Sequence, residues 1–197
     1  MIPAAYRIGP NAIIQVRHAL ERIVGKAPAD DLVVGAGLGG YLLAPPEHMV
    51  DEREVIALHT AVRQRLGAKS ARDVLRMAGL ATGDYLLAHR IPKPAQWVLR
   101  ALPAPLAARV LVATITRNAW TFAGSGRFAA HAGRPVVITI DNNPICRGVT
   151  SDEPVCDYFA ATFERLFQRL VHPRARVVET RCAAVGASGC RFEIHWR

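Results

Sequence analysis

Apolar residues change their spacing near residue 127, and this change constrains the fold more than any other feature of the chain. Before it, apolar side chains recur every three or four residues, which predicts helices; after it, they alternate, which predicts strands. Helices followed by strands are typical of α+β domains, in which antiparallel strands form a sheet and helices cover one of its faces. We therefore expect an α+β fold with N-terminal helices packed on an antiparallel sheet.

Capping residues and helix breakers set the bounds of the predicted helices. Asn11, Asp51 and Ser70 are suited to N-cap positions, and Gly67 is suited to end a helix. The proline-marked stretch 92–105 separates the third helix from the fourth. The four predicted helices span residues 11–24, 51–67, 70–91 and 106–123.

The C-terminal third is predicted to hold strands and one further helix. Val136, Ile138 and Ile140 occupy alternate positions, as in a strand, and the polar turn 141–144 follows them. The next predicted elements are a helix at 156–171 and two strands at 175–182 and 190–196, joined by the small-residue loop AAVGASG.

Residues 35–40, GAGLGG, match the G-x-G-x-x-G pattern of dinucleotide-binding turns. Such a turn follows a strand and opens a helix whose N-terminus holds the pyrophosphate. Here the chain before Leu32 has helical spacing, and only Tyr41 to Ala44 separate the pattern from Pro45. The residues about twenty positions further on include no acidic residue for the ribose. We interpret the segment as a glycine-rich connection between helices, not as a cofactor site.

The chain carries a formal charge of +9, almost all of it from arginine. Such an excess is compatible with nucleic acid, an anionic membrane surface, an acidic partner or a carboxylate ligand, and also with an arginine-rich composition that has no functional meaning. The basic residues are scattered, without a long basic run or a recognition motif, so we do not expect nucleic-acid binding. No apolar run approaches the ~18 residues of a membrane span, and the N-terminus lacks a signal-peptide pattern. We therefore expect a cytoplasmic protein that is not transmembrane.

Three cysteines and one glutamate near the C-terminus have the chemistry of a metal site. Cys182 and Cys190 lie at the facing ends of the last hairpin. Cys156 begins the preceding helix, and Glu179 lies on the strand before Cys182. Three thiolates and a carboxylate form a closed donor set suited to a structural Zn²⁺. The alternatives are free buried thiols or a labile disulfide between Cys182 and Cys190.

This donor set makes a specific demand on the strand that carries Glu179. Glu179 and Cys182 are an odd number of residues apart, so a regular strand would point them to opposite faces of the sheet. A bulge or a bend beginning at Thr180 is therefore required if both are to reach one ion.

The same region resembles the C-terminal signature of 4-vinyl reductase domains. The similarity lies in the segments ETRC (179–182) and GCRF (189–192), with Gly186 between them. This family includes the aromatic-sensing domains of bacterial enhancer-binding regulators, in which three cysteines and a glutamate hold zinc in the same order. The resemblance thus implies that Cys156, Glu179, Cys182 and Cys190 bind zinc. Cys146 has no counterpart in that set, and we interpret it as an ordinary thiol.

Further stretches resemble the branch of this family that serves bacteriochlorophyll biosynthesis, and together they cover nearly the whole chain. The resemblance implies helices against an antiparallel sheet, as in vesicle-tethering (TRAPP) subunits and nitric-oxide-sensing domains. Dimers are common in that fold family, so we expect a homodimer. We divide the chain into an N-terminal helical segment, 1–69, and a ligand-binding domain, 70–197, which form one compact unit. The similar stretches are RIGPNAIIQ (7–15), GDYLLAHRIPKPAQ (83–96), NAWTFAGSGRF (118–128), NNPICRG (142–148) and the portion from Cys156.

The resemblance also implies a ligand between the helices and the sheet, with a histidine and a tryptophan as polar anchors. His89 and Trp120 are the nearest candidates by position. Arg90 and Arg127 are suited to pair with the propionates of a tetrapyrrole. Each candidate also has a purely structural interpretation, as a core aromatic, a helix-end histidine or a solvated arginine. The full candidate set is His89, Arg90, Trp120, Phe122, Gly124, Gly126 and Arg127.

Two functions follow from this interpretation. The first is a carrier or accessory factor that binds a magnesium porphyrin, or a divinyl protochlorophyllide or chlorophyllide, with magnesium chelatase or another pathway enzyme as partner. The second is the vinyl-group reductase that the family name describes. Reduction of an alkene needs a two-electron donor, and the sequence contains no recognisable nicotinamide, flavin or iron–sulfur motif. We therefore favour binding, with a location in the cytoplasm or at the surface of the photosynthetic membrane.

Overall fold

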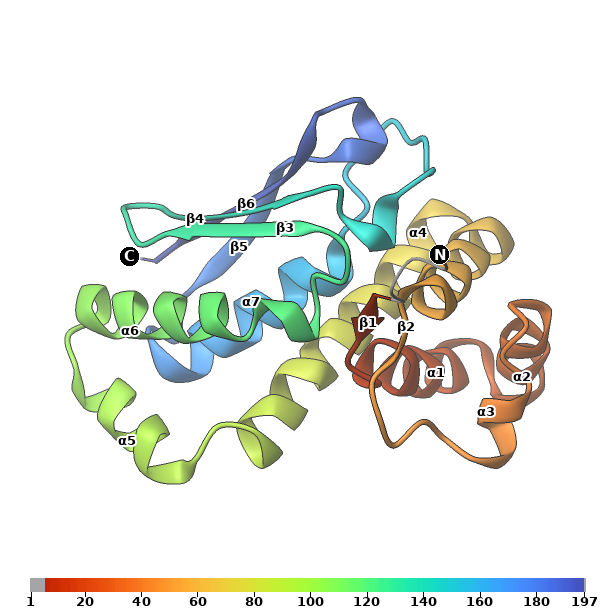
Figure 1. Ribbon diagram of the computed structural model, residues 1–197, viewed down its shortest axis with the longest axis horizontal. Helices are drawn as coiled ribbons and strands as arrows, with labels where there is room; N and C mark the ends of the chain where they lie inside the picture. Colours follow the sequence, from red (N-terminus) through yellow and green to blue (C-terminus); the bar gives the residue numbers. More distant parts are fainter. Residues whose placement is uncertain (1–5, 197) are drawn as a thin grey trace, which may run out of the picture.

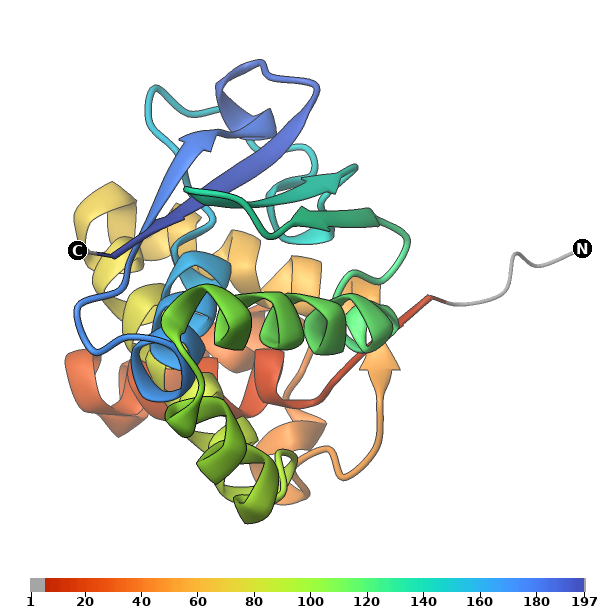
Figure 2. The same ribbon diagram turned by 90° about the vertical axis from the view of Figure 1, so that its left-hand side faces the viewer.

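Helices form the N-terminal two-thirds and a four-stranded sheet the C-terminal third of the computed structural model, which describes residues 6–196 (Figure 1). The sheet lies over helices α6 (Ala104–Arg117) and α7 (Asp157–Leu170). Helices α1 to α3 lie at the other end of the molecule, where α1 and α2 pack on helix α4 (Glu52–His89). Figure 2 shows the same two layers from the side, with the strands above the helices. This arrangement confirms the expected α+β class.

The remaining elements are short. The other helices are α1 (Asn11–Val24), α2 (Lys26–Gly35), α3 (Gly40–Leu43), α5 (Lys93–Ala101) and the 3-10 turns η1 (Ala119–Thr121), η2 (Pro144–Cys146) and η3 (Ala183–Val185). The strands are β1 (Arg7–Ile8), β2 (Val50–Asp51), β3 (Arg127–His131), β4 (Val136–Asp141), β5 (Arg176–Arg181) and β6 (Gly189–His195).

Helix α4 differs from the sequence prediction, which ends one helix at Gly67 and begins another at Ser70. Gly67 does leave the helical conformation, with φ 72° and ψ 172°, but the helix resumes at the next residue. A single glycine with positive φ therefore makes a kink, not a connection, and Ser70 lies inside the helix instead of capping it. The predicted boundary at residues 69 and 70 falls within α4.

The proline-marked stretch 92–105 is also more regular than predicted, because it contains α5. Pro94 lies in the first turn of α5, where a helix loses no hydrogen bond through the missing N–H group. The following helix, α6, likewise begins next to prolines and ends at Arg117. The predicted extension to residue 123 is replaced by the turn η1.

The glycine-rich segment 35–40 connects helices, as predicted. Leu32 and Val33, the apolar residues before it, are buried positions of α2, not of a strand. The segment leads into the single turn of α3. The arrangement required for a dinucleotide-binding turn, strand followed by long helix, is thus missing at this segment.

The main sheet has the strand order β3-β4-β6-β5, and all its neighbours are antiparallel. Its inner face is continuous and apolar: Val136, Ile138 and Ile140 of β4 and Phe192 and Ile194 of β6 are completely buried. The alternating residues that predict β4 thus form the floor of the core, against which α7 packs.

Helices α4 and α7 cross at two glycines, and this contact joins the N-terminal helices to the sheet layer. A Cβ atom at Gly79 would lie 2.3 Å from the backbone oxygen of Tyr158, so only glycine permits the observed approach. At Gly83, a Cβ atom would lie 2.6 Å from Cβ of Arg165. The Thr82 hydroxyl lies 3.0 Å from the Tyr158 hydroxyl within the same interface.

His59 is a completely buried histidine of α4 whose position has consequences for acid stability. Its Nε2 lies 3.3 Å from the carbonyl oxygen of Ala12, so Nε2 carries the proton and donates, while Nδ1 is buried without a partner. Burial, together with the nearby Arg63 charge, lowers the pKa of His59 from 6.5 to about 3. The imidazole is therefore neutral in the folded protein.

We expect acid to destabilise the protein through His59. The folded-state pKa lies below the unfolded value, so the stability contribution is complete above pH 6.5 and is lost as the pH falls from 6.5 toward 3. Between pH 7 and pH 5, the parent should lose about 2 kcal/mol more unfolding free energy than His59→Gln, which cannot titrate. Urea unfolding at both pH values measures the difference. Equal losses in parent and variant would contradict a neutral buried His59.

Candidate metal centre

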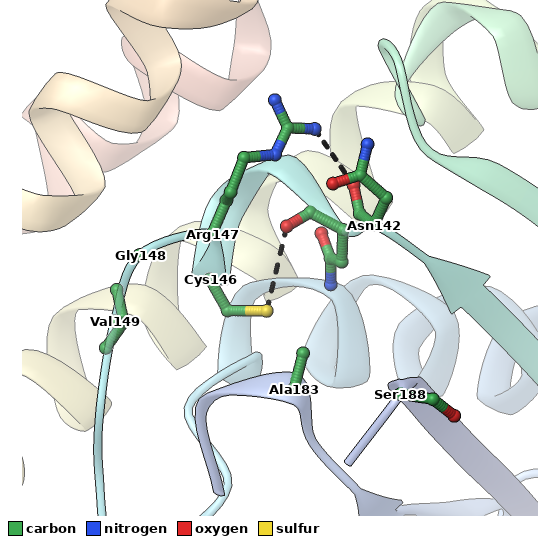
Figure 3. Close-up of a pocket in the computed structure, with 8 residues that line it drawn as sticks. Asn142, Cys146, Arg147, Gly148, Val149, Ala183 and Ser188 are labelled. Carbon is green, nitrogen blue, oxygen red and sulfur yellow. Dashed lines mark hydrogen bonds between the residues drawn. The ribbon is translucent and has the colours of Figure 1, made fainter. Parts of the chain in front are cut away.

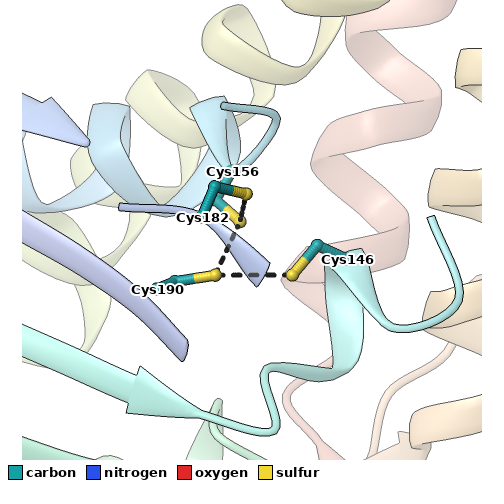
Figure 4. A group of neighbouring side chains, drawn as sticks. All are labelled: Cys146, Cys156, Cys182 and Cys190. Atoms are coloured by element: carbon teal, nitrogen blue, oxygen red, sulfur yellow. Dashed lines mark hydrogen bonds between the residues drawn. The ribbon is translucent and has the colours of Figure 1, made fainter. Parts of the chain in front are cut away.

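Four cysteines that are distant in sequence meet between the sheet and the start of α7. Cys146 ends η2, Cys156 is the N-cap of α7, Cys182 follows β5 and Cys190 lies in β6. All four are buried, with at most 2% of each residue exposed. Figure 4 shows the sulfur atoms converging from four separate segments of the chain. We call these four residues the cysteine cluster.

The sulfur atoms of the cysteine cluster are spaced as a single tetrahedral ion requires. Cys190 Sγ lies 3.4 Å from Cys146 Sγ and 3.5 Å from Cys156 Sγ, and Cys156 Sγ lies 3.9 Å from Cys182 Sγ. All four sulfur atoms lie within 4.8 Å of one another. Zinc–sulfur bonds of ~2.3 Å in tetrahedral geometry place the sulfur atoms about 3.8 Å apart. The donor set therefore fits one ion of the zinc type and leaves too little room for a multi-iron cluster.

The predicted irregularity in β5 is present and brings Cys182 into the cysteine cluster. The pairing of β5 with β6 shifts register between Glu179 and Arg181. The chain then turns through η3, and Gly186 adopts the left-handed conformation, with φ 91°, that closes the loop. Cys190 needs no such adjustment, because it lies opposite Ile140 on the buried face of the sheet.

Glu179 lies beside the cysteine cluster and makes one defined contact with it. Its Oε2 accepts a hydrogen bond of 2.8 Å from the backbone N–H of Cys156, whereas its Oε1 is buried without a partner. Burial and the neighbouring Cys182 raise the pKa of Glu179 to about 10. A buried carboxylate oxygen without a donor costs free energy unless a proton or a cation satisfies it, so this oxygen is a further candidate donor for a metal.

Cys146, an ordinary thiol in the sequence interpretation, has its sulfur inside the cysteine cluster. The resemblance gives it no counterpart, and ten residues separate it from Cys156 without a known metal-binding spacing. Both residues lie in the connection between β4 and α7, which folds back so that η2 contacts α4. The only signal in the sequence is that this one connection holds two cysteines.

Arg63 of α4 holds the connection in place, and sequence reasoning did not identify it. Its Nη1 donates to the carbonyl oxygen of Ile145 at 2.8 Å, and its Nη2 donates to that of Val155 at 3.0 Å. These are the residues immediately before Cys146 and Cys156. One guanidinium therefore fixes both cysteine-bearing backbones and also brings a positive charge close to thiolates that would otherwise repel one another.

The thiols of the cysteine cluster differ in their readiness to ionise. Hydrogen bonds from Cys146 and Cys156 lower the pKa of Cys182 to about 6. Burial raises the pKa of Cys156. Cys156 Sγ also accepts a hydrogen bond of 3.3 Å from the Asn143 side-chain amide. A thiolate is therefore available near neutral pH to begin metal binding.

A surface pocket of about 300 Å³ adjoins the cysteine cluster at Cys146. Asn142, Arg147, Ala183 and Ser188 are among its lining residues, and Figure 3 shows the Cys146 sulfur facing into it. Arg147 is held by Glu52 at 3.2 Å. The pocket supplies a short path between solvent and the cysteine cluster.

Comparison with known proteins places this site in a family. Over 190 residues, 96% of the chain, the sequence is 49% identical to the bacteriochlorophyll synthase 23 kDa chain of Cereibacter sphaeroides and covers 91% of that protein. It is 45% identical to the protein of the same name from Rhodobacter capsulatus, of which it covers 87%. The chain belongs to the bacteriochlorophyll synthase 23 kDa chain family. Within this family member, residues 136–196 match the 4-vinyl reductase domain, and this range holds the cysteine cluster and Glu179.

Solved structures with the same fold are H-NOX proteins. One, described in a study of heme distortion in the H-NOX family, superposes with a TM-score of 0.59 at 14% identity, covering 96% of this chain and 95% of the other. An unliganded Fe(II) H-NOX protein from K. algicida gives 0.60 at 10% identity, covering 95% of this chain and 96% of the other. These values confirm the predicted relation to nitric-oxide-sensing domains at the level of the fold.

The candidate ligand residues of this family member do not surround one open pocket. His89, Arg90 and Arg127 are exposed, and the His89 ring lies 4.6 Å from that of Tyr85. Trp120 is 66% exposed. Only Phe122 reaches the interior, where its ring packs edge-on against three aromatic rings between the helices and the sheet: Phe128 at 5.4 Å, Phe159 at 5.9 Å and Phe163 at 6.1 Å.

The two candidate glycines are required by the fold itself. Gly124 has φ 54°, and a Cβ atom there would lie 2.4 Å from Oε2 of Glu52. At Gly126, a Cβ atom would lie 2.9 Å from the backbone oxygen of Ala123. Their small size thus has a structural reason, whereas a role in approaching a flat ring stays a prediction.

Proposed function

We propose that this protein is a carrier or accessory factor that binds a tetrapyrrole intermediate of bacteriochlorophyll biosynthesis, either a magnesium porphyrin or a divinyl protochlorophyllide or chlorophyllide. The observation that supports this most strongly is the 49% identity, across nearly the full length of both chains, to a protein named for bacteriochlorophyll synthesis. The likeness to H-NOX proteins, one of them described by its heme, concerns the fold alone and is compatible with the proposal.

The aromatic layer around Phe122 is where we place the ring of the ligand. It lies between the helices and the sheet, and its rings meet edge-on or stacked at 5.4 to 6.1 Å. A flat macrocycle would replace these aromatic contacts by stacking on the same side chains. Arg127 begins β3, next to this layer and exposed to solvent, where it is suited to pair with a propionate.

The cysteine cluster supports a structural zinc ion that fixes the edge of this layer. Cys156, Cys182 and Cys190 would each supply a thiolate, and either Cys146 or Glu179 would supply the fourth donor. Such a closed set leaves no position for a catalytic water, and it would tie η2, α7 and the last hairpin together. The zinc would therefore stabilise the fold and would not take part in chemistry on the ligand.

Binding without reduction is the form of this proposal that the residues favour. The segment that matches a dinucleotide-binding pattern connects two helices and lacks the preceding strand. The alternative, a reductase acting on the vinyl group of a divinyl tetrapyrrole, would need a hydride donor bound elsewhere. We further propose that the protein acts as a homodimer in the cytoplasm or at the photosynthetic membrane surface, with magnesium chelatase or another pathway enzyme as partner. Among residues 6–196, no helix combines the length and apolarity needed to cross a bilayer.

The test is to mix the purified protein with a divinyl protochlorophyllide and NADPH, and to record both the absorption spectrum and the vinyl content of the pigment. We expect a stoichiometric spectral shift and unchanged vinyl groups. Trp120→Phe should weaken binding, whereas Trp97→Phe, which alters an equally exposed tryptophan outside the candidate site, should not. Catalytic loss of vinyl groups would favour the reductase, and the absence of any shift would contradict tetrapyrrole binding.

A further inference from the structure

One long segment of the chain contains no acidic residue. Residues 85–140 hold seven of the 25 lysine and arginine residues and none of the 16 acidic ones. The rest of the chain therefore has 18 basic and 16 acidic residues and is nearly neutral. The basic residues are thus less evenly distributed than the absence of long basic runs indicates. Nearly all of the excess positive charge belongs to the end of α4, helices α5 and α6, and strands β3 and β4.

The seven basic side chains of this segment are exposed and, within residues 6–196, have no acidic side chain at ion-pair distance. Elsewhere, arginines are commonly neutralised, for example Arg17 by Glu21 and Arg165 by Asp84. The charges of the seven are consequently available to an outside partner. The seven residues are Arg90, Lys93, Arg100, Arg109, Arg117, Arg127 and Arg134.

Large apolar side chains are exposed among these charges. On α5, Trp97 is 66% exposed and Val98 is 60% exposed. On α6, Leu106 and Val110 lie one turn apart on the outward stripe, nearly half exposed, and Trp120 follows on η1. Figure 2 places α5 and α6 at the front of the molecule, and the two helices pack against each other. We call the exposed side of α5, α6 and η1 the basic–apolar face.

We propose that the basic–apolar face docks the protein on an anionic lipid bilayer. Tryptophan is favoured at the boundary between headgroups and acyl chains, where an apolar ring and a polar N–H are both accommodated. Exposed valine and leucine can enter the same boundary, while arginine and lysine pair with anionic headgroups. This inference rests on the membrane location proposed above and gives that location a surface; it does not depend on the bound ligand.

Other occupants fit this face less well. A two-fold contact with a second copy would place the same patch on both sides, so its unpaired positive charges would oppose one another. Nucleic acid or an acidic protein would satisfy the charges, but phosphate contacts leave no partner for the exposed valine, leucine and tryptophan side chains of α5 and α6. Only a lipid boundary offers both kinds of contact over a broad area.

The experiment uses sedimentation of the full chain, without pigment, with vesicles of equal parts phosphatidylglycerol and phosphatidylcholine, or of phosphatidylcholine alone. We expect binding to the anionic vesicles only, weakened by added salt. A variant with Lys93→Gln, Arg109→Gln and Arg117→Gln should bind on the order of 100-fold more weakly, at about fivefold per charge. Trp97→Gln should reduce binding about tenfold and abolish part of the blue shift in tryptophan fluorescence.

The matched control removes the same charge from the other end of the molecule. A variant with Arg22→Gln, Arg65→Gln and Lys69→Gln alters three exposed residues of α1 and α4 and should keep at least about a third of the parent's affinity. An equal loss in the control would overturn the assignment of the face. Displacement by a DNA duplex together with an unaffected Trp97→Gln variant would overturn the choice of a lipid partner. Failure of vesicle binding with an intact pigment shift would refute the docking surface but not the carrier function.

Discussion

Replacing Cys156 by Ser, or stripping the bound metal with a chelator, is expected to lower the unfolding free energy by about 5 kcal/mol or more. The physical reason is that one ion would join four segments that have few other links, and that removing it leaves buried thiols crowded at 3.4 to 3.9 Å. Loss of a structural metal belongs to the small group of changes with effects of this size. We expect the variant to be poorly soluble and its urea midpoint to fall far below that of the parent.

Two matched variants identify the fourth donor. If Cys146 binds the ion, Cys146→Ser should lose metal and stability as Cys156→Ser does, while Glu179→Gln should keep the metal. If Glu179 binds the ion, the two results should be reversed. Metal content by elemental analysis and urea unfolding, measured on the same preparations, distinguish these outcomes. A parent protein that is folded but free of metal when purified without chelators would show that the cysteine cluster is simply a buried set of thiols.

Gly79→Ala is expected to destabilise the protein by about 3 kcal/mol, although alanine is normally the better helix former. The added methyl group would lie 2.3 Å from the backbone oxygen of Tyr158 and 2.8 Å from Cβ of Ala161. Neither contact is with the flexible end of a side chain, so α4 and α7 must move apart. Because α7 begins next to Cys156, the displacement would also disturb the cysteine cluster.

Gly35→Ala is the matched control for this substitution. Gly35 is also helical, and a Cβ atom there would have no atom within 4 Å. Its replacement should therefore raise stability by about 0.5–1 kcal/mol through the lower entropy of the unfolded chain. Urea unfolding of both variants gives the comparison. Similar effects at the two positions would mean that the close crossing of α4 and α7 does not exist in solution.

Local patterns in the sequence predicted most of the secondary structure. The helix at 11–24, the strand from Val136 and the irregularity between Glu179 and Cys182 all follow from spacing that neighbouring residues determine, and the structure has them. The errors occurred where one residue gave the signal: Gly67 ended a predicted helix but only kinks α4, and the prolines after residue 92 hid α5. Tertiary packing overrides a single breaker when the helix on both sides has a surface to cover.

The metal donors were predictable in part, for the same reason. Cys182, Cys190 and Glu179 belong to one hairpin, so their proximity is a local property that spacing reports. Cys146 and Arg63 could not be found in this way. They meet the hairpin only because α4 packs on α7 and the connection before Cys156 folds back over both. Contacts between distant segments depend on the summed burial of many side chains, and no short stretch of sequence carries that information.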